Sequence, residues 1–366
     1  MMNKFYNALI RCNHYVLFTP IILSAAGIVS ISGLACNNGT FPSREVLIQS
    51  AALLAGMISA AAILMLGCRY FTNLEKFIYI ASILFLLSVY LPGAGTTFYG
   101  SRAWLDLGIV TLQPSEFVKI SFVIIMASYL NRSYDSLQSP SGITKAALYG
   151  MPFIIIVAKE DFGSGCVFCA IWLFMVFCSG LELKTLARLS MAAAAIMPLI
   201  YYLLAGYQKD RIDAFFQPDN LELPGNYQVW NSKAAIGSAG ILGKGFMNGI
   251  QAPLGFLPVP ESDFIFAASV EDFGLIGGMT IILLFAVLIY HTLKTAKYAS
   301  DLTGTLICAG LAGMYAFQAF ENIAMNMGIM PVTGITLPFL SYVGSSMLAS
   351  MSGIGLILSV SCRQKL

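Results

Sequence analysis

The chain has 366 residues, of which 58% are hydrophobic and 10% are charged, and its mean hydropathy is +0.78. These values exclude an ordinary soluble domain and a disordered chain. The formal net charge of +2 says little about partners, and it gives no reason to expect a nucleic acid among them.

Apolar segments recur from one end of the chain to the other. Lipid offers the backbone no hydrogen-bond partner, so a segment that crosses a membrane forms a helix of roughly 20 residues unless it joins a closed barrel. The segments lack the alternating pattern of barrel strands. The sequence therefore predicts an all-α polytopic membrane protein, a single domain over residues 1–366, with about ten transmembrane helices. These are expected at 15–35, 47–68, 76–92, 113–130, 144–158, 164–181, 185–206, 264–291, 303–327 and 340–361.

The distribution of basic residues predicts the orientation of these helices. Of the twenty Lys and Arg residues, twelve fall in loops on the side of the N-terminus, seven fall in the alternate loops, and Lys119 falls within a span. Because basic loops face the cytoplasm, both termini are expected to be cytoplasmic and the number of spans even. The long loop over 207–263, between the seventh and eighth spans, is then extracytoplasmic. The first span lacks a small-residue cleavage site, so we expect it to be retained.

The end of this loop carries the first candidate for chemistry. Asp263 stands directly before the apolar run that opens the eighth span. Burial beside apolar residues raises the pKa of a carboxyl and makes it a general base near neutral pH. The same position is typical of a helix N-cap, and residue type alone favours the cap. Earlier in the loop, the apolar, glycine-rich stretch 232–249 predicts a short helix against the membrane surface or between spans.

Residues 93–122 carry a second group of candidates. Glu116 and Lys119 are three residues apart, so they share a helical face and are expected to pair inside the bilayer. Such a pair either locks helices together or lines a polar cavity. Arg102 and Trp104 form a basic and aromatic element, which is either a binding element or an interface anchor; the anchor is the more common role of Trp.

Further polar residues stand between apolar runs. KEDFGSG, with Asp161 at its centre, is a charged turn between two spans and most simply a solvated one. Lys233 and Lys244 could neutralise a phosphate, but the sequence around them does not fit a nucleotide-binding loop. Cys166 and Cys169 have no second ligand pair nearby, so no metal site is expected.

Residues 320–346 combine polar side chains with helix breakers. Asn322 and Asn326 follow Glu321 in an apolar helix, which Pro331 then ends. Irregular backbone at such depth is tolerated only where it lines a cavity or is buried in protein. The segment therefore predicts a polar chamber that opens outward.

Five motifs stand in the chain in a fixed order. They are GSRAWLDLG with QPSEFVKI, KEDFGSG, GNYQVWNSKAAIGSAGILGKG, LPVPESDFIFAASVEDFG and NMGIMPVTGITLPFLSYVGSS. In sequence and in spacing they resemble the motifs of the SEDS family (shape, elongation, division and sporulation), which includes RodA and FtsW. The resemblance covers nearly the whole chain, and the third motif is nearer to RodA than to FtsW.

The resemblance implies a peptidoglycan glycosyltransferase with ten spans in the bacterial plasma (inner) membrane. Such enzymes polymerise lipid II, a disaccharide-pentapeptide on undecaprenyl pyrophosphate, at the outer face. The family's catalytic Asp falls on Asp263, and Trp104, Glu116, Lys119 and Asp161 match residues associated with activity or with the central cavity. The aspartate would take a proton from the acceptor's 4-hydroxyl as that oxygen attacks C1 of the donor and pyrophosphate leaves with inversion.

The resemblance also implies partners. SEDS proteins work with a class B penicillin-binding protein, a transpeptidase that crosslinks the strands, within a rod-shape or division complex. A divalent cation, Mg²⁺ or Mn²⁺, that bridges pyrophosphate and carboxylates suits the acidic outer face, but the sequence shows no ligand set. Two other functions stay open: a lipid II flippase or transporter, because a polar cavity with membrane-embedded charge also fits translocation, and a non-catalytic scaffold.

The chain departs from the family motifs at several positions. Ala103 stands where the family has an Arg, with Arg102 one position earlier, and Val343 replaces a glycine. Val259 and Glu261 replace a Glu and a His next to the catalytic Asp. The carboxylate of Glu261 is expected to raise the pKa of that Asp by like-charge repulsion.

Overall fold

The computed structural model describes residues 12–37, 43–181 and 201–363, without positions 94, 99, 100, 107, 109, 110, 203, 253 and 258. Between 182 and 200 it describes only 184, 185, 187, 188, 191 and 195. Among these residues, six helices are long and apolar enough to cross a membrane. They are α2 (His14–Asn37), α3 (Arg44–Leu66), α7 (Pro140–Glu160), α12 (Ile265–Lys297), α13 (Leu302–Asn326) and α14 (Gly344–Ser361).

Other helices fill out the bundle. They are α4 (Cys68–Asn73), α5 (Glu75–Leu87) with its continuation η1 (Ser88–Tyr90), α6 (Pro114–Arg132), η2 (Tyr134–Gln138) and α8 (Phe162–Cys178). Proline opens both α6 and α7, where its fixed φ suits the first turn and its missing N–H costs nothing. The prediction of a helical, polytopic membrane protein is confirmed. More than half of the expected span at 185–206 lies outside the described residues, so this span is not tested.

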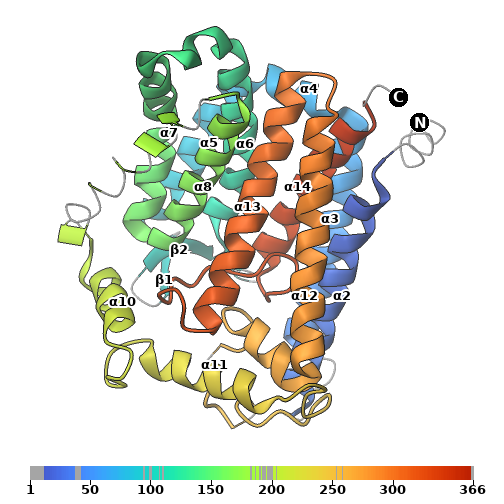
Figure 1. Ribbon diagram of the computed structural model, residues 1–366, viewed down its shortest axis with the longest axis vertical. Helices are drawn as coiled ribbons and strands as arrows, with labels where there is room; N and C mark the ends of the chain where they lie inside the picture. Colours follow the sequence, from blue (N-terminus) through green and yellow to red (C-terminus); the bar gives the residue numbers. More distant parts are fainter. Residues whose placement is uncertain are drawn as a thin grey trace.

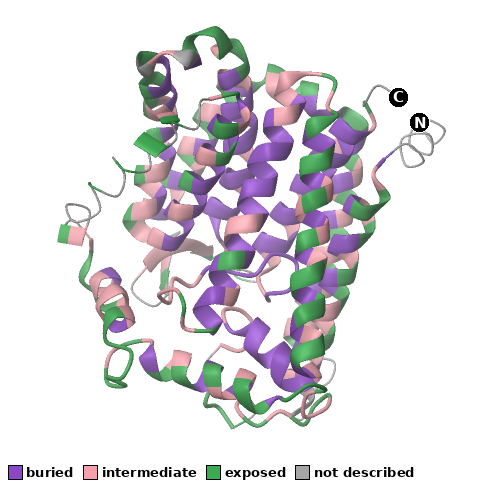
Figure 2. Cartoon of the chain, viewed as in Figure 1, coloured by how far each residue is buried: buried purple, intermediate pink, exposed green. Residues whose placement is uncertain are grey.

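The core of the bundle is formed by α13 and α14, whose side chains are mostly buried, whereas α3 and α12 expose one face (Figure 2). α14 packs along α3, and α13 packs against both α8 and α12. These helices approach closely: a Cβ on Gly355 would lie 2.7 Å from the Cα of Ala60. Such close contact through small residues is how helices associate in lipid, where the solvent is as apolar as the side chains.

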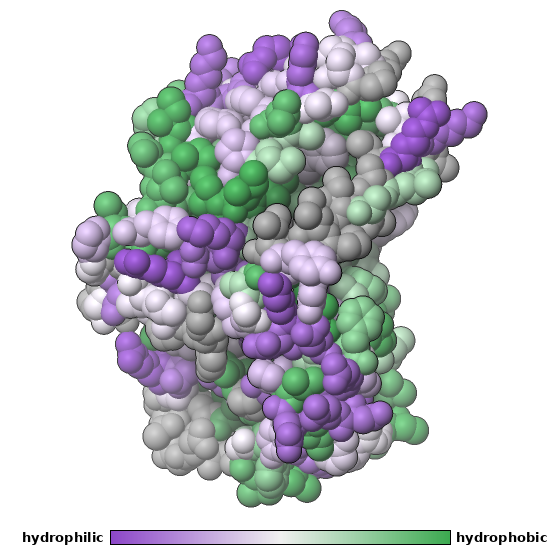
Figure 3. Space-filling model, turned by 90° about the vertical axis from the view of Figure 1, so that its left-hand side faces the viewer, coloured by the Kyte–Doolittle hydropathy of each residue, from purple (hydrophilic) through white to green (hydrophobic). Residues whose placement is uncertain are grey.

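The outward faces carry large apolar side chains, such as Ile58 of α3 and Leu283 of α12, which are 71% and 63% exposed. On the side that Figure 3 shows, hydrophobic side chains gather in a band, with hydrophilic ones at the upper end and over much of the lower half. An exposed apolar surface of this kind fits contact with lipid rather than with water.

The segment before α6 is a small exception within the helical fold. It forms a small antiparallel sheet of β1 (Gly95–Phe98), β2 (Ser101–Asp106) and β3 (Thr111–Leu112), in the order β1-β2-β3. Leu105 at the centre pairs with Gly95 on one side and with Leu112 on the other. The β-branched and aromatic residues of these strands favour a pleated surface, and the segment is too short to cross a membrane as a helix.

The long loop contains two helices, α10 (Gly206–Phe216) and α11 (Asn226–Ser238). α11 covers the start of the stretch 232–249, where a short helix was expected, and it packs against α12 and α13. The start of α2 and the end of α14 lie at one end of the bundle, whereas α10 and α11 lie toward the other (Figure 1).

The eighth expected span, α12, is interrupted at Gly274, where φ of 71° and ψ of −168° are not helical. The carbonyls of residues 271–272 accept hydrogen bonds from the amides of 244–245, and the amides of 275–276 donate to the carbonyls of 240–241. The loop thus replaces helical bonds that are lost at the break, and these four backbone groups of α12 are paired without water.

Candidate active site

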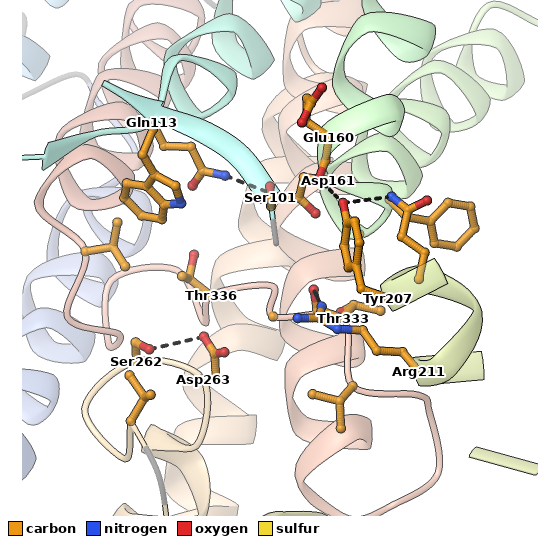
Figure 4. A pocket seen from close by; sticks show the side chains of 18 of the residues that line it. Ser101, Gln113, Glu160, Asp161, Tyr207, Arg211, Ser262, Asp263, Thr333 and Thr336 are labelled. Atoms are coloured by element: carbon orange, nitrogen blue, oxygen red, sulfur yellow. Dashed lines mark hydrogen bonds between the residues drawn. The ribbon is translucent and has the colours of Figure 1, made fainter. Parts of the chain in front are cut away.

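A cavity of about 400 Å³ lies where several helix ends meet (Figure 4). Its wall is formed by β2, the residue before α6, the junction of α7 and α8, the helix α10, the residues before α12 and the irregular segment after α13. The polar chamber expected from residues 320–346 is therefore a cavity of the folded chain. The described residues that line it carry four carboxylates and one cation, namely Glu160, Asp161, Glu261, Asp263 and Arg211.

Asp263 lies in this cavity and does not cap α12. The residue in the N-cap position is Phe264, and no side chain caps that helix end. The hydroxyl of Ser262 donates to Oδ1 of Asp263 at 3.1 Å, while Oδ2 has no hydrogen-bond partner in the described part of the chain. The side-chain amides of Asn322 and Asn326 both donate to the backbone carbonyl of Asp263 at 3.0 Å. The two asparagines therefore fix the backbone and leave the carboxylate to the cavity.

The pKa of Asp263 is raised above its ordinary value. Burial among protein atoms is the main cause, and the charge of Glu261 adds a smaller contribution in the same direction, as the sequence predicts. The hydrogen bond from Ser262 and the charge of Arg211 oppose the shift. A carboxylate with a raised pKa is the stronger base, which suits proton abstraction.

Arg211 is the residue that sequence reasoning missed. Its Nη1 donates to the carbonyl of Thr333 at 2.9 Å. A Cβ placed on Gly334 would lie 3.6 Å from Oδ2 of Asp263 and 3.7 Å from this Nη1, so the acid and the guanidinium flank one small space. The helical spacing of Tyr207 and Arg211, four residues apart, could have indicated that they share a face.

Asp161 has a structural role as well as a place in the cavity. Its side chain caps α8, since Oδ1 accepts from the amide of Ser164 at 3.1 Å and Oδ2 from the Ser164 hydroxyl at 2.6 Å. Gln113 also donates to Oδ2, at 3.2 Å. Nearby, the hydroxyl of Tyr207 donates to the carbonyl of Glu160 at 2.6 Å, which ties α10 to the end of α7.

The two candidates on β2, Arg102 and Trp104, lie at different hollows. Trp104 lines the cavity. Arg102 instead borders a smaller hollow beside α5 and α7, where its guanidinium donates to the carbonyl of Leu91 at 3.4 Å and its amide donates to Glu160 at 3.2 Å. Arg102 is therefore not among the described residues that line the main cavity.

The remaining basic candidates also lie outside the cavity wall. Lys244 forms an ion pair of 2.6 Å with the buried Glu271 of α12, so its charge is already neutralised. Lys233 is exposed and borders a small neighbouring hollow. Lys119 and Glu116 form the expected ion pair, at 2.8 Å, and are only 2% and 6% exposed.

The departures from the family motifs can be placed as well. Val259 and Val343 both line the cavity. Val343 has an extended backbone with φ of −148°, which any residue adopts, so a glycine is not required there. Val259 has φ of 49°, a left-handed conformation that is unfavourable for a β-branched residue and that lies four residues before Asp263.

No group of three or more His, Cys, Asp or Glu side chains in the described residues could hold a metal ion. Asp161 and Asp263 are two of the four carboxylates that line the cavity, and a cation shared with a bound pyrophosphate would need fewer protein ligands.

Comparison with known proteins places the chain in a family. The profile of the family described as "Cell cycle protein", which covers FtsW, RodA and SpoVE, matches residues 11–366. The chain is 33% identical over 314 residues to peptidoglycan glycosyltransferase MrdB of Escherichia coli K12, which covers 85% of this chain and 84% of that protein. It is 28% identical over 425 residues to peptidoglycan glycosyltransferase RodA of Treponema pallidum, with 96% and 98% covered.

Solved structures share the fold. One, described as showing structural coordination of polymerization and crosslinking by a peptidoglycan synthase complex, has a TM-score of 0.80 at 26% identity and covers 96% of this chain and 97% of that one. The rod shape determining protein RodA of Thermus thermophilus has a TM-score of 0.69 at 25% identity, with 96% of each chain covered. The match over residues 11–366, together with the five motifs and the membrane fold, shows that the chain belongs to the FtsW/RodA/SpoVE family, as the resemblance predicts.

Proposed function

We infer that this protein is a peptidoglycan glycosyltransferase that polymerises lipid II at the outer face of the bacterial cell membrane, with Asp263 as the general base. The observation that carries the assignment of the base is the position of Asp263, whose Oδ2 has no partner among the described residues and faces a cavity that also holds Arg211. Its relatives are named as peptidoglycan glycosyltransferases, and a flippase is therefore not favoured.

The reaction needs one base and a stabilised leaving group. Oδ2 of Asp263 accepts the proton of the acceptor's 4-hydroxyl while the oxygen forms its bond to C1 of the donor sugar. The bond from C1 to the pyrophosphate oxygen breaks, and its electron pair leaves with the pyrophosphate. Pyrophosphate is a good leaving group, so no acid has to protonate it. Ser262, Asn322 and Asn326 orient the base through the hydrogen bonds described above.

The membrane topology is part of the proposal. About ten spans, both termini in the cytoplasm and the loop 207–263 outside would put Asp263 at the outer face. The position of the start of α2 and the end of α14 at the same end of the bundle, away from α10 and α11, supports an even number of crossings (Figure 1). The excess of basic residues in the loops on the N-terminal side supports the orientation.

The cavity residues receive different roles. Trp104 offers an aromatic face for a sugar ring, and Asp161 holds the start of α8 at the cavity wall. The Glu116 and Lys119 pair stabilises the bundle around the cavity. Of the two lysines proposed for phosphate contact, Lys244 is engaged elsewhere and Lys233 lies at the margin.

A class B penicillin-binding protein is the proposed partner, as a transpeptidase in a rod-shape or division complex. This is supported by the similarity to a chain from a peptidoglycan synthase complex that coordinates polymerization and crosslinking. Relatives with both names, RodA and FtsW, match the chain at similar identity, so a RodA-like role stays a prediction.

The function is tested with purified protein, labelled lipid II and vesicles. The protein, with and without a co-purified transpeptidase, is expected to produce glycan chains from labelled lipid II. In vesicles, a fluorescent lipid II analogue is expected to stay in its leaflet. Movement of the analogue between leaflets without chain growth would show that the protein is a flippase and not a polymerase. If neither activity is found, a scaffold is the remaining function.

A further inference from the structure

The cavity has a marked excess of negative charge for a site that handles pyrophosphate. The four carboxylates that line it face one guanidinium among the described lining residues. A bound pyrophosphate therefore needs a cation at a defined place, and a guanidinium suits it because its N–H groups form a planar fork that matches two phosphate oxygens.

The other basic residues near the cavity are unsuited to this task. Lys244 is paired with Glu271 at 2.6 Å, and Arg102 donates to a backbone carbonyl in another hollow. Lys233 is exposed, with its aliphatic stem against Gly328. Arg211 remains as the cation that reaches the space beside Asp263.

The guanidinium of Arg211 is held by a short chain of contacts. One N–H group, at Nη1, donates to the carbonyl of Thr333 at 2.9 Å, and no other N–H group of Arg211 has a hydrogen-bond partner in the described part of the chain. The hydroxyl of Thr333 donates to Oε1 of Glu321, which lies on α13 and is 1% exposed. The buried carboxyl of Glu321 therefore holds the side chain of Thr333, and the backbone carbonyl of Thr333 accepts from Arg211.

The next residue keeps the space between acid and cation open. Gly334 has φ of 78°, which favours glycine, and the place of its missing Cβ lies 3.6 Å from Oδ2 of Asp263 and 3.7 Å from Nη1 of Arg211. A small group bound there touches both. A displacement needs a base at the attacking hydroxyl and a cation at the departing oxygen, and one group of each kind borders this space.

We propose that Arg211 binds the pyrophosphate of the donor, and that Glu321 and Thr333 are positioning residues that hold the guanidinium in place. The proposal rests on the proposed function, which supplies the pyrophosphate. As the bond from C1 to the leaving oxygen breaks, negative charge grows on pyrophosphate, and the free N–H groups of Arg211 stabilise it while Asp263 takes the proton.

The experiment compares Arg211→Gln and Arg211→Lys with Lys209→Gln, a matched control that removes one positive charge two residues away on the same helix, outside the cavity wall. Binding of undecaprenyl pyrophosphate and of undecaprenol is measured on each purified protein, together with KM and kcat for lipid II. Arg211→Gln is expected to weaken the binding of undecaprenyl pyrophosphate about 10- to 100-fold, which is the range for a charged hydrogen bond. The binding of undecaprenol should not change. Arg211→Lys keeps the charge but not the fork, so a smaller loss is expected.

The positioning role has its own variants. Glu321→Leu removes the acceptor of the Thr333 hydroxyl and is expected to weaken the binding of undecaprenyl pyrophosphate several-fold. Glu321→Gln keeps an oxygen acceptor, so it should bind this lipid nearly as tightly as wild type. Heat stability in detergent is recorded for each variant, so that a general loss of structure is recognised by an equal loss of undecaprenol binding.

The outcomes separate the two proposals. If wild-type protein forms no glycan, the proposed function fails, while the binding measurements still decide on Arg211. If wild-type protein forms glycan and Arg211→Gln binds undecaprenyl pyrophosphate as tightly as Lys209→Gln does, the assignment of Arg211 is overturned. If Glu321→Leu and Glu321→Gln bind undecaprenyl pyrophosphate equally tightly, Glu321 is not a positioning residue.

Discussion

Two sets of charges in this protein differ in how completely they are partnered. Inside the bundle, Lys119 donates to Glu116 at 2.8 Å, and at the edge of the bundle the exposed Arg132 donates to the buried Glu75 at 2.8 Å. In the cavity, Oδ2 of Asp263 has no such partner among the described residues. A buried charge that is fully paired ties its neighbours together, whereas one that is left unpaired beside a cavity is costly and is a candidate for chemistry. The structure thus separates side chains that look alike in the sequence.

The largest effect is expected from removing the unpaired acid. Asp263→Asn keeps the shape of the side chain but cannot accept the proton, so glycan synthesis should fall by about 10²- to 10⁴-fold, the usual contribution of a general base. Chain formation from labelled lipid II measures this. Asp219→Asn, the same change at an exposed loop position, is the control and should leave synthesis unchanged. If Asp263→Asn forms chains as wild type does, Asp263 is not the general base.

A large effect on stability is expected from breaking a paired charge. Lys119→Met leaves Glu116 buried and unpaired, which costs about 3–5 kcal/mol, and the double variant with Glu116→Leu should recover most of the loss. Heat stability in detergent gives the ranking. If the double variant is stable but makes no glycan, the pair takes part in the reaction and the distinction between the two sets of charges breaks down.

A smaller effect is expected at the break in α12. Lys244→Gln removes the ion pair to Glu271, whose carboxylate still accepts from the amides of Ile250 and Gln251. The loss of stability should be about 1–2 kcal/mol, and KM for lipid II should stay that of wild type. An increase in KM at unchanged stability would instead return Lys244 to the phosphate-binding role that its sequence suggested.

The smallest effect is a shift in pH dependence. Since the base works only when ionised and its pKa is raised, kcat/KM should fall on the acidic side at a pH above the ordinary range of a carboxyl group. Glu261→Gln removes a like charge, so the acidic limb should move to lower pH. An unmoved limb would show that Glu261 does not act on the base.

The same raised pKa has a consequence for stability. Because the pKa of Asp263 is higher in the folded protein, its ionised form opposes folding at pH values above that pKa, and this cost declines as the pH falls from that pKa toward the ordinary pKa of an Asp. Asp263→Asn should therefore be at least as heat-stable as wild type at neutral pH. Heat stability that is clearly lower than that of wild type would mean that the carboxylate supports the fold.

The fold was predictable because hydropathy decides it. Lipid-crossing helices need long apolar runs, and the chain supplies them from α2 to α14 with few charges between. The small sheet was not predictable in this way, because strands of two to six residues in an apolar context leave no periodic signal. The break in α12 depends on a loop some thirty residues earlier, which no local pattern contains.

The candidate site was predictable in part. The motifs bring Asp263, Asp161 and Trp104 to one cavity, but they do not say which basic residue joins them. Lys244 stands in a motif and is engaged with Glu271, while Arg211 stands between motifs and reaches the cavity. Proximity across fifty residues or more is a product of packing, and the local pattern of a single sequence does not record it.

Gly334 gives the site an unusual vulnerability. The place of the methyl group that this residue lacks lies 3.6 Å from the acid and 3.7 Å from the guanidinium, so its neighbours would tolerate that methyl at ordinary van der Waals distance. Gly334→Ala would strain the backbone by about 1 kcal/mol and leave every charge in place, yet the added carbon would occupy the space between the proposed base and the proposed phosphate-binding guanidinium. A protein inactivated in this manner would keep its heat stability in detergent and lose its glycan, which distinguishes a filled reaction volume from a missing reactive group.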